Sequence, residues 1–276
     1  MLRLGEKQEL TIAKFTGFGA YLAGEDPAET VLLPKKEVPQ DAQAGDALRV
    51  FLYKDSQDRL IATTRESALT LGKVALLKVK EVSRIGAFLD WGLEKDLLLP
   101  FHEQTARVKA GQDCLVALYI DKSGRLAATM NVYPYLSQNS PYVVGDQVYG
   151  RIYETSDNFG VFVAVEDRYS ALIPKAEAFT DFQIGDVIEA RVTQVKEDGK
   201  LNLSVRKKAY LQMDEDAQLV LKVIDEYDGV LPFGEKASPE LIKREFGLSK
   251  NAFKRAVGRL LKEGKIRLEE NRIFRT

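Results

Sequence analysis

Residues 157–174 read DNFGVFVAVEDRYSALIP, and this stretch decides the fold. Phe159 and Phe162 flank Gly160 at the start of an apolar run that ends at Pro174. In a regular strand, residues three apart point to opposite faces, so the two rings could not serve one surface. Gly160 would permit a bulge that turns both rings outward. The alternative is that one or both rings fill the core of a small domain.

The stretch belongs to a unit that occurs three times. The glycine motif reads FGAYL at 18–22, IGAFL at 85–89 and FGVFV at 159–163. In each copy an apolar run then ends in proline, at Pro34, Pro100 and Pro174. These landmarks shift by 66 or 67 residues from the first copy to the second, and by 74 from the second to the third. The nearly constant offsets indicate tandem copies of one domain.

Each copy has the two-residue periodicity of β-strands. In the third copy, five short apolar segments cover 148–153, 159–165, 171–173, 187–195 and 201–205. The turn EDGK before the last segment contains the Asp-Gly pair typical of hairpins. Five strands in about 65 residues fit a small closed barrel. The sequence therefore predicts three barrels, over residues 1–66, 67–140 and 141–208.

The remaining segment, residues 209–276, changes to the 3.6-residue period of helices. An apolar stripe is predicted on the first helix: Met213, Ala217, Val220, Ile224 and Tyr227. Ser238 and Ser249 are predicted to cap two further helices, which end at Gly247 and Gly264. Two short strands are predicted within 265–275. Three helices followed by a hairpin are the order of a winged helix, and residues 238–276 resemble that family.

The third copy resembles the S1 RNA-binding domain, an oligonucleotide-binding (OB) fold. The resemblance rests on FG-x-FV, GD-x-I and DGKLNLSVR, and it extends from Asp146 to Lys207. The first copy looks like a divergent member and the second like a more divergent one, with Ile85 where the family has its first aromatic residue. The predicted fold is thus mainly β with a C-terminal α/β part: three tandem five-stranded S1-like OB barrels followed by a winged helix.

Exposed rings on a barrel face would stack on unpaired bases, which suits every base because each has a π-face. The candidate stacking residues are Phe159, Phe162, Phe18, Tyr21 and Phe88. The resemblance also implies a basic residue at the start of the last strand, where a phosphate contact would position the nucleic acid. The corresponding residues are Lys200, Arg59 and Arg125. At these positions a solvated strand end is an equally good interpretation.

The whole chain has a net charge of −1, but its basic residues are unevenly distributed. Residues 1–210 contain 27 Lys and Arg against 29 Asp and Glu, whereas the segment from Lys236 onward contains 12 against 5. Such an excess suits either a polyanionic partner or a solvated helix face. Opposite the apolar stripe of the third predicted helix lie Asn251, Lys254, Arg255, Arg259 and Lys262. In DNA-binding relatives this helix enters the major groove.

Several function classes have no support in the sequence. With one cysteine, Cys114, and one histidine, His102, the chain offers no internal disulfide and no thiolate or histidine metal cluster. No carboxylate pair has a spacing that suggests acid–base chemistry, and no cofactor motif is present. No apolar run is long enough to span a bilayer. We therefore expect a cytoplasmic protein that is not an enzyme and requires neither metal nor cofactor.

The order of domains resembles the conserved virulence factor B family of bacterial RNA-binding regulators. The resemblance covers the full length and implies a protein that binds single-stranded RNA and influences gene expression after transcription. Two alternatives stay open. One is a DNA-binding transcription regulator that uses the winged helix, and the other is a protein-interaction scaffold bound to the ribosome or to a nuclease.

Overall fold

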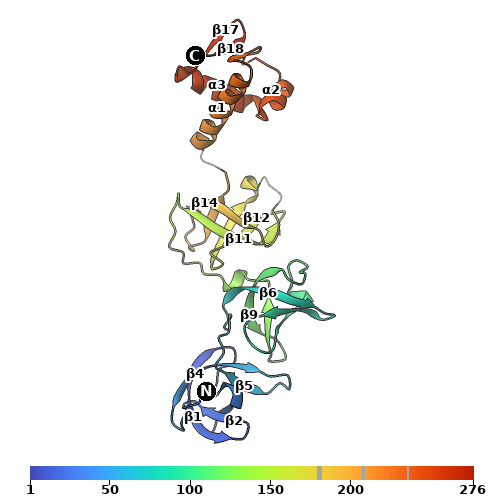
Figure 1. Cartoon of the computed structure of the whole chain (residues 1–276), viewed down its shortest axis with the longest axis vertical. Coiled ribbons are helices and arrows are strands. Elements are labelled where there is room, and N and C mark those ends of the chain that lie inside the picture. The colour runs from blue at the N-terminus through green and yellow to red at the C-terminus, as the bar shows by residue number, and fades with distance from the viewer. Residues whose placement is uncertain (179–181, 207–208, 235) are drawn as a thin grey trace. The chain divides into compact units, whose positions relative to one another are not determined.

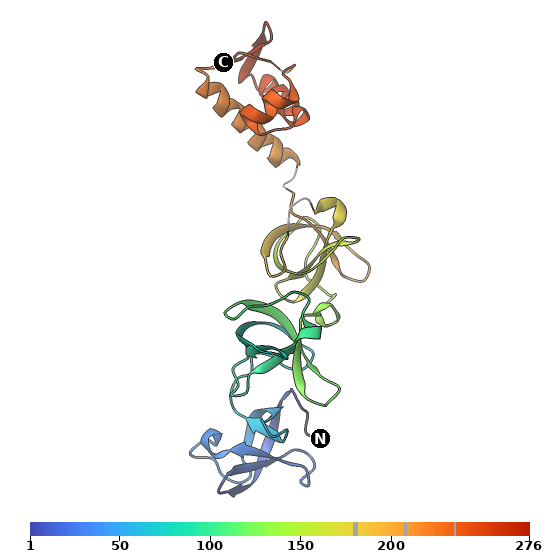
Figure 2. The same cartoon turned by 90° about the vertical axis from the view of Figure 1, so that its right-hand side faces the viewer.

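A computed structural model describes residues 1–178, 182–206, 209–234 and 236–276. The chain forms two compact units, Met1–Val205 and Arg206–Thr276. The first unit contains the three barrels, coloured from blue to yellow in Figure 1, and the second contains the orange and red helical part. Figure 2 shows the same β-rich and helical parts from the side.

The first and third barrels are closed and have the same topology. The first contains β1 (Lys7–Thr16), β2 (Gly19–Ala23), β3 (Thr30–Pro34), β4 (Ala47–Lys54) and β5 (Leu60–Thr63). The third contains β11 (Gln147–Ser156), β12 (Gly160–Val165), β13 (Tyr169–Pro174), β14 (Val187–Val195) and β15 (Leu201–Ser204). A short parallel pairing, β3 with β5 and β13 with β15, closes each barrel. The predicted OB topology is confirmed.

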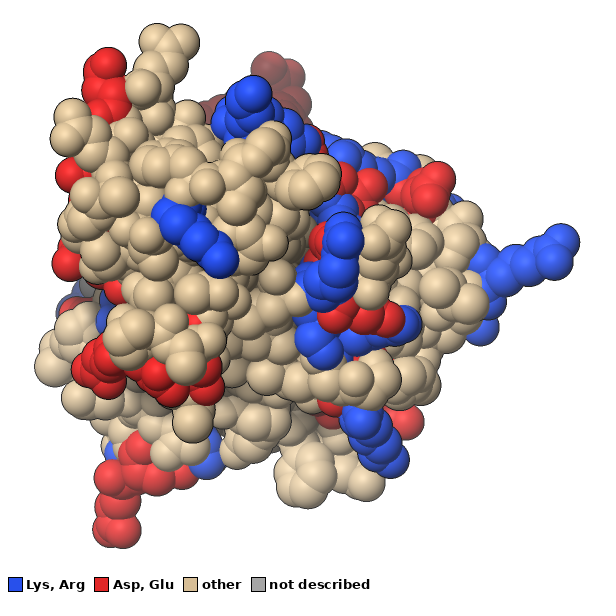
Figure 3. Space-filling view, turned by 90° about the horizontal axis from the view of Figure 1, so that it is seen from below, with Lys and Arg blue, Asp and Glu red and all other residues tan. Residues whose placement is uncertain are grey.

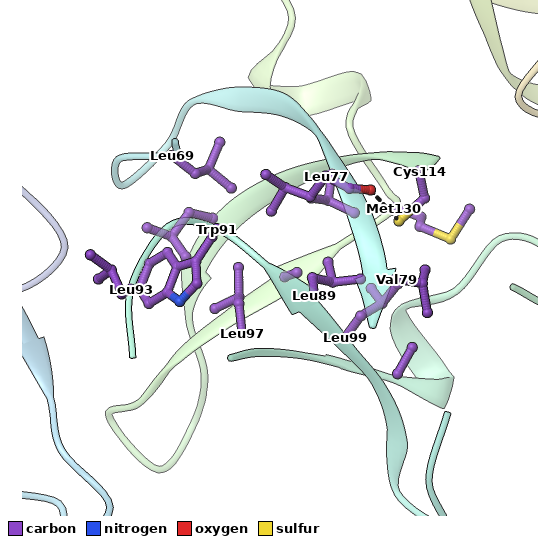
Figure 4. Packing of buried hydrophobic residues seen from close by; sticks show 14 of the residues in the cluster. Leu69, Leu77, Val79, Leu89, Trp91, Leu93, Leu97, Leu99, Cys114 and Met130 are labelled. Carbon is purple, nitrogen blue, oxygen red and sulfur yellow. Dashed lines mark hydrogen bonds between the residues drawn. The ribbon is translucent and has the colours of Figure 1, made fainter. Parts of the chain in front are cut away.

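The middle copy forms a five-stranded sheet. Its strands are β6 (Val74–Val82), β7 (Gly86–Asp90), β8 (Leu97–Pro100), β9 (Asp113–Ile120) and β10 (Leu126–Thr129). They have the order β10-β9-β6-β7-β8, in which equivalent strands are neighbours as in the other two copies. Figure 4 shows its leucine-rich core, with Trp91 at one end beside Leu93 and Leu97. The Cys114 thiol is buried in this core and donates a weak hydrogen bond, 3.7 Å long, to the Leu77 carbonyl.

The glycine of the repeated motif has a different role from the predicted one. In the pairing of β11 with β12, the bulge lies on β11, between Ile152 and Glu154, and not at Gly160. Gly160 instead has a φ of +116°, and a Cβ there would overlap the carbonyl oxygen of Ile173. The backbone of residues 173–175 passes directly over this glycine, so only a residue without a side chain fits.

Contacts between successive barrels join the first unit. The rings of Phe51 in β4 and Trp91 pack edge to face, with centroids 5.7 Å apart. Between the second and third barrels, Leu115 and Ala117 of β9 share a buried cluster with Tyr153 of β11. The connector supplies further members of that cluster around the 3₁₀ turn η3 (Tyr133–Tyr135). The connector is therefore packed against the barrels.

The second unit is a winged helix, as predicted. It contains α1 (Ala209–Glu226), β16 (Val230–Leu231), α2 (Pro239–Phe246), α3 (Lys250–Lys262), β17 (Ile266–Glu269) and β18 (Arg272–Arg275). The hydroxyls of Ser238 and Ser249 cap α2 and α3, and Gly247 ends α2 with a φ of +68°.

The apolar stripe predicted for α1 needs correction at its end. Ala217, Val220 and Ile224 are buried, but Tyr227 is 38% exposed, and its hydroxyl donates to the carboxylate of Glu245. Asp228 and Gly229 both have positive φ angles, which ends the helix before Tyr227 can complete the stripe. The side chain of Met213 lies outside the described residues.

Candidate nucleic-acid interface

The third barrel has a cluster of aromatic rings at its surface. Phe159 lies in the turn before β12 and is 65% exposed, while Phe162 on β12 is half-buried. Their ring centroids are 6.5 Å apart. The positive φ at Gly160 thus brings a turn residue and a strand residue to one surface, which a regular strand could not do.

A third ring comes from outside the barrel. Tyr133 of η3 is 42% exposed, and its ring packs edge-on against Phe162 with centroids 6.3 Å apart. We call Tyr133, Phe159 and Phe162 the aromatic surface. Its middle ring, Phe162, is supported from within by the buried ring of Tyr153, at 6.1 Å. Phe162 therefore differs from the prediction of a fully outward ring: it is partly core and partly surface.

Lys200 lies at the edge of the aromatic surface. Its Nζ is 5.4 Å from the centre of the Tyr133 ring and 2.8 Å from Asp198 Oδ2. The hydrogen bond to Asp198, with a smaller contribution from Tyr133, raises the pKa of Lys200 to about 12. The ammonium is charged at physiological pH, as an ordinary lysine would be, and it lies beside the Tyr133 ring while paired with Asp198.

The first barrel has a smaller version of this arrangement. Phe18 is 79% exposed in the turn before β2, and Tyr21 on β2 is half-buried beneath the Nζ of Lys14, at 5.3 Å. Arg59 is exposed and forms an ion pair with Asp55 of its own hairpin, at 2.7 Å. An exposed ion pair contributes little to stability, so the guanidinium can exchange its partner for a phosphate.

The second barrel differs from the other two in its aromatic positions and in the pairing of its basic residue. Ile85 is exposed where the other copies have phenylalanine, and Phe88 is half-buried in the wall of a pocket. Arg125 forms an ion pair with Asp58, which belongs to the first barrel. The basic residue of this copy is thus held across a barrel junction, whereas Arg59 and Lys200 are paired within their own hairpins.

On α3 of the winged helix, four of the five predicted contact residues are exposed. They are Asn251, Lys254, Arg255 and Lys262. Arg259 differs, because its guanidinium lies 2.7 Å from the carboxylate of Glu263 one turn later and is half-buried. Within the described residues, Lys254, Arg255 and Lys262 form no ion pair.

Gly258 lies in the same exposed stripe of α3, at helical spacing from Arg255 and Lys262. Among the residues that the structure describes, no atom lies within 4 Å of a Cβ placed at this position, and the φ of Gly258 is not positive. Neither packing nor backbone conformation therefore requires a glycine here, although a glycine inside a helix weakens it.

Sequence reasoning did not identify Tyr133 or Gly258. Tyr133 lies in the connector outside the repeated unit, so comparison of the three copies could not align it. Gly258 could have been noticed in the sequence, because a glycine inside a predicted helix weakens that helix relative to alanine.

Charge is mixed over the face seen in Figure 3, where Lys and Arg side chains alternate with Asp and Glu and with broad uncharged areas. Among the residues that the structure describes, no three His, Cys, Asp or Glu side chains are grouped to hold a metal ion. No helix in the described ranges has the length and apolar character needed to cross a membrane.

Comparison with known proteins matches each part of the chain. Residues 4–65 and 71–131 match the S1 domain, 137–207 match the second domain of virulence regulatory factor CvfB, and 218–274 match the CvfB-like winged helix domain. A crystal structure of a multidomain protein with nucleic acid binding domains from Streptococcus pneumoniae is 25% identical and has a TM-score of 0.50. The alignment covers 99% of this chain and 98% of that one.

Two relatives are similar over most of their length. The uncharacterized protein YitL of Bacillus subtilis is 32% identical over 96% of this chain and 91% of its own. Conserved virulence factor B of Staphylococcus epidermidis is also 32% identical, over 93% of this chain and 89% of its own. The chain therefore belongs to the conserved virulence factor B family.

Proposed function

We propose that this protein binds single-stranded RNA and regulates gene expression after transcription. The observation that carries the proposal is the aromatic surface of the third barrel with Lys200 at its edge. The proposed activity is binding without a chemical step, metal or cofactor. We place it in the cytoplasm, where a buried, reduced thiol such as Cys114 is stable.

The geometry favours unpaired bases over a duplex. Rings that stand out from a barrel can stack on bases whose faces are free, and each such contact contributes about 1–3 kcal/mol. The bases of a duplex are already stacked on one another and present edges, not faces, to a protein. Phe159 and Tyr133 expose enough of their rings to offer such contacts, and Lys200 supplies a charge for the adjacent phosphate.

Affinity is expected to depend weakly on RNA sequence. The aromatic surface provides stacking, and Lys200 provides a phosphate contact, neither of which identifies a base. The exposed cations of α3 add phosphate contacts of the same kind. The name of the matched second domain, virulence regulatory factor, supports a regulatory role for this chain.

Fluorescence anisotropy with labelled single-stranded RNA, single-stranded DNA and duplex DNA of equal length tests the proposal. We expect tightest binding to single-stranded RNA, with log affinity falling against log salt by about 0.7 for each phosphate neutralised. An affinity that does not change with salt, or a clear preference for duplex DNA, would contradict it.

A second candidate is recognition of duplex DNA by α3. It is favoured by Asn251, Lys254, Arg255 and Lys262, which share the exposed side of that helix, where a winged helix can enter a major groove. The isolated segment 209–276 would then prefer one duplex sequence over others by a large factor. Equal, weak binding to all duplexes would assign these cations to phosphate contacts. If no oligonucleotide binds the whole protein even at low salt, the result would favour the alternative of a protein-interaction scaffold.

A further inference from the structure

The face of the second barrel that corresponds to the aromatic surface is not open. Ile85 and Phe88 occupy the positions of Phe159 and Phe162, but here they line a pocket of about 230 Å³. The opposite wall comes from the first barrel, through Tyr53 and Lys54 at the end of β4. The pocket is therefore a feature of the junction, and neither barrel forms it alone.

The lining combines an apolar interior with a basic margin. Trp91 and Leu97, two of the core residues seen in Figure 4, form part of the interior, together with Phe88. Lys54, Lys95 and Arg125 supply the positive charges. A flat apolar ligand with an attached anion matches this lining, because the ring would stack on Phe88 while the anion remained beside the cations.

Two carboxylates also line the pocket, but both already accept hydrogen bonds. Asp96 is 2.7 Å from the ammonium of Lys80. One oxygen of Asp121 accepts from the backbone N–H groups of Ser123 and Arg125, at 2.8 and 3.0 Å. These partners offset the negative charges that would otherwise repel an anion.

The size of the pocket restricts the ligand. Sites that enclose drug-sized ligands have volumes of about 300–1,000 Å³, so about 230 Å³ suits one planar ring system and not several linked nucleotides. The pocket also reaches the surface, since Ile85 and Arg125 at its margin are exposed. A base on a strand could enter while its neighbours stayed outside.

Contacts between the first and second barrels join the two walls of the pocket. Lys95 donates from Nζ to the backbone oxygen of Asp55, at 3.0 Å. The Phe51–Trp91 ring contact joins the barrels beneath. A preformed pocket loses little conformational entropy on binding, which favours affinity.

We propose that this junction pocket receives a single unpaired nucleobase, stacked on Phe88, with its phosphate beside Lys54, Lys95 and Arg125. The phosphate would then take the place of Asp58 as the partner of Arg125. That the base belongs to an RNA strand rests on the proposed function. A free nucleoside monophosphate has the same chemistry and is the other source of such a base.

The test uses the full chain and RNA oligonucleotides that carry one 2-aminopurine, placed at successive positions. One position should change its fluorescence on binding because its base leaves solvent and stacks. Phe88→Ala should abolish that change and weaken RNA binding about fivefold or more. Leu98→Trp, which fills the pocket beside Phe88, should do the same without removing core volume. Val82→Ala, an exposed β6 residue outside the pocket, is the control, and thermal unfolding checks each fold.

The variant Asp58→Asn tests the same pocket through an expected gain of affinity. It releases Arg125 from its partner, so the affinity for RNA should rise while the position of the responding base stays the same. Loss of affinity in Asp58→Asn with an intact fold would contradict the exchange of Asp58 for phosphate.

Titration with adenosine and cytidine monophosphates distinguishes the two sources and separates this inference from the proposed function. Mononucleotide binding that is lost in Phe88→Ala supports the pocket even if no RNA binds. RNA binding that depends on Phe159 but not on Phe88 or Leu98, with no mononucleotide bound, overturns the pocket and leaves the proposed function standing.

Discussion

At the scale of single residues, the aromatic surface depends on a glycine. Gly160 holds a backbone conformation that side chains disfavour, and it lies directly beneath the chain that leaves β13. The N–H of Lys175 donates to the carbonyl of Phe159 at 3.0 Å, which fixes the turn that carries the exposed ring. A Cβ at Gly19 or Gly86 would likewise overlap the carbonyl oxygen of Leu33 or Leu99, so every copy requires a glycine at this position.

Gly160→Ala should therefore destabilise the third barrel by at least about 1–3 kcal/mol, because strain and steric overlap act together. Gly185→Ala is a matched control in the same barrel. Its φ of +100° is also strained for alanine, but a Cβ there would meet no atom of the described residues within 4 Å. Denaturant unfolding should show the larger loss for Gly160→Ala. Equal losses would mean that the close approach of Ile173 is unimportant.

Cys114 provides a prediction about pH. Burial, and to a smaller extent Asp113, raises the pKa of the Cys114 thiol from 9.0 to about 12. The folded state thus favours the neutral thiol, and its stability should decline as pH rises from about 9 toward 12, where the unfolded chain ionises first. At pH 8 a thiol reagent should label the native protein far more slowly than the urea-unfolded protein. Rapid labelling of the native protein would show that the thiol is accessible.

At the scale of elements, α3 combines a buried face with an exposed stripe that includes a glycine. Phe253, Ala256, Val257 and Leu260 form the buried face. The exposed stripe places Gly258 between Arg255 and Lys262, where no neighbour within the described ranges would obstruct a side chain. A nucleic-acid backbone that lies close against the helix would account for the missing side chain.

Gly258→Ala should raise the unfolding free energy of the winged helix by about 0.5–1 kcal/mol, because alanine favours the helix. The same change should weaken RNA binding, because the added methyl group holds the phosphate backbone away. Thermal unfolding and anisotropy on one sample measure both effects. A gain in stability with unchanged affinity would indicate that no ligand approaches α3 at this point.

At the scale of the whole molecule, the second unit carries the excess of positive charge. Residues from Lys236 onward contain 12 basic and 5 acidic residues, whereas residues 1–210 have slightly more acidic than basic ones. In the second unit several cations are engaged, among them Arg244 with Glu245 and Arg259 with Glu263. We therefore expect the exposed Lys254, Arg255 and Lys262 to contribute to the attraction of the second unit for a polyanion.

Replacing Lys254, Arg255 and Lys262 with glutamate should weaken RNA binding by a similar factor for all sequences. It should also reduce the salt dependence by about 0.7 for each phosphate that the protein no longer neutralises. The same charge change at Lys73, Lys109 and Lys122, which are exposed on the second barrel, is the control. An equal effect from both triple variants would assign the weaker binding to net charge and not to α3.

Much of the fold could be predicted from local pattern. In each copy, the repeated glycine marks the start of one strand and the repeated proline marks the end of the next. The structure pairs these two residues in all three copies: Gly19 with Pro34, Gly86 with Pro100 and Gly160 with Pro174. Serine caps likewise located α2 and α3. These features depend on residues close in sequence or on hydrophobic period.

The candidate site could be predicted less completely because its geometry depends on distant residues. Tyr133 reaches the aromatic surface only because the connector packs on the third barrel. Arg125 is paired with Asp58 of another barrel, which the sequence of neither copy indicates. The Arg259–Glu263 pair, in contrast, has the i,i+4 spacing from which an ion pair on a helix can be predicted. The three copies of one motif therefore have different surroundings: open in the first and third barrels and enclosed in the second.

The most direct measurement compares the RNA affinity of Phe159→Ala/Tyr133→Ala with that of Tyr149→Ala by anisotropy at one salt concentration. Tyr149 is an equally exposed aromatic residue of β11, far along the strand from Glu154, the partner of Phe162. The double variant should lose about 1–3 kcal/mol of binding free energy for each stacked base, whereas Tyr149→Ala should bind like the unmodified protein. If the double variant, Tyr149→Ala and the unmodified protein all remain folded and bind RNA equally well, the aromatic surface is not the RNA site.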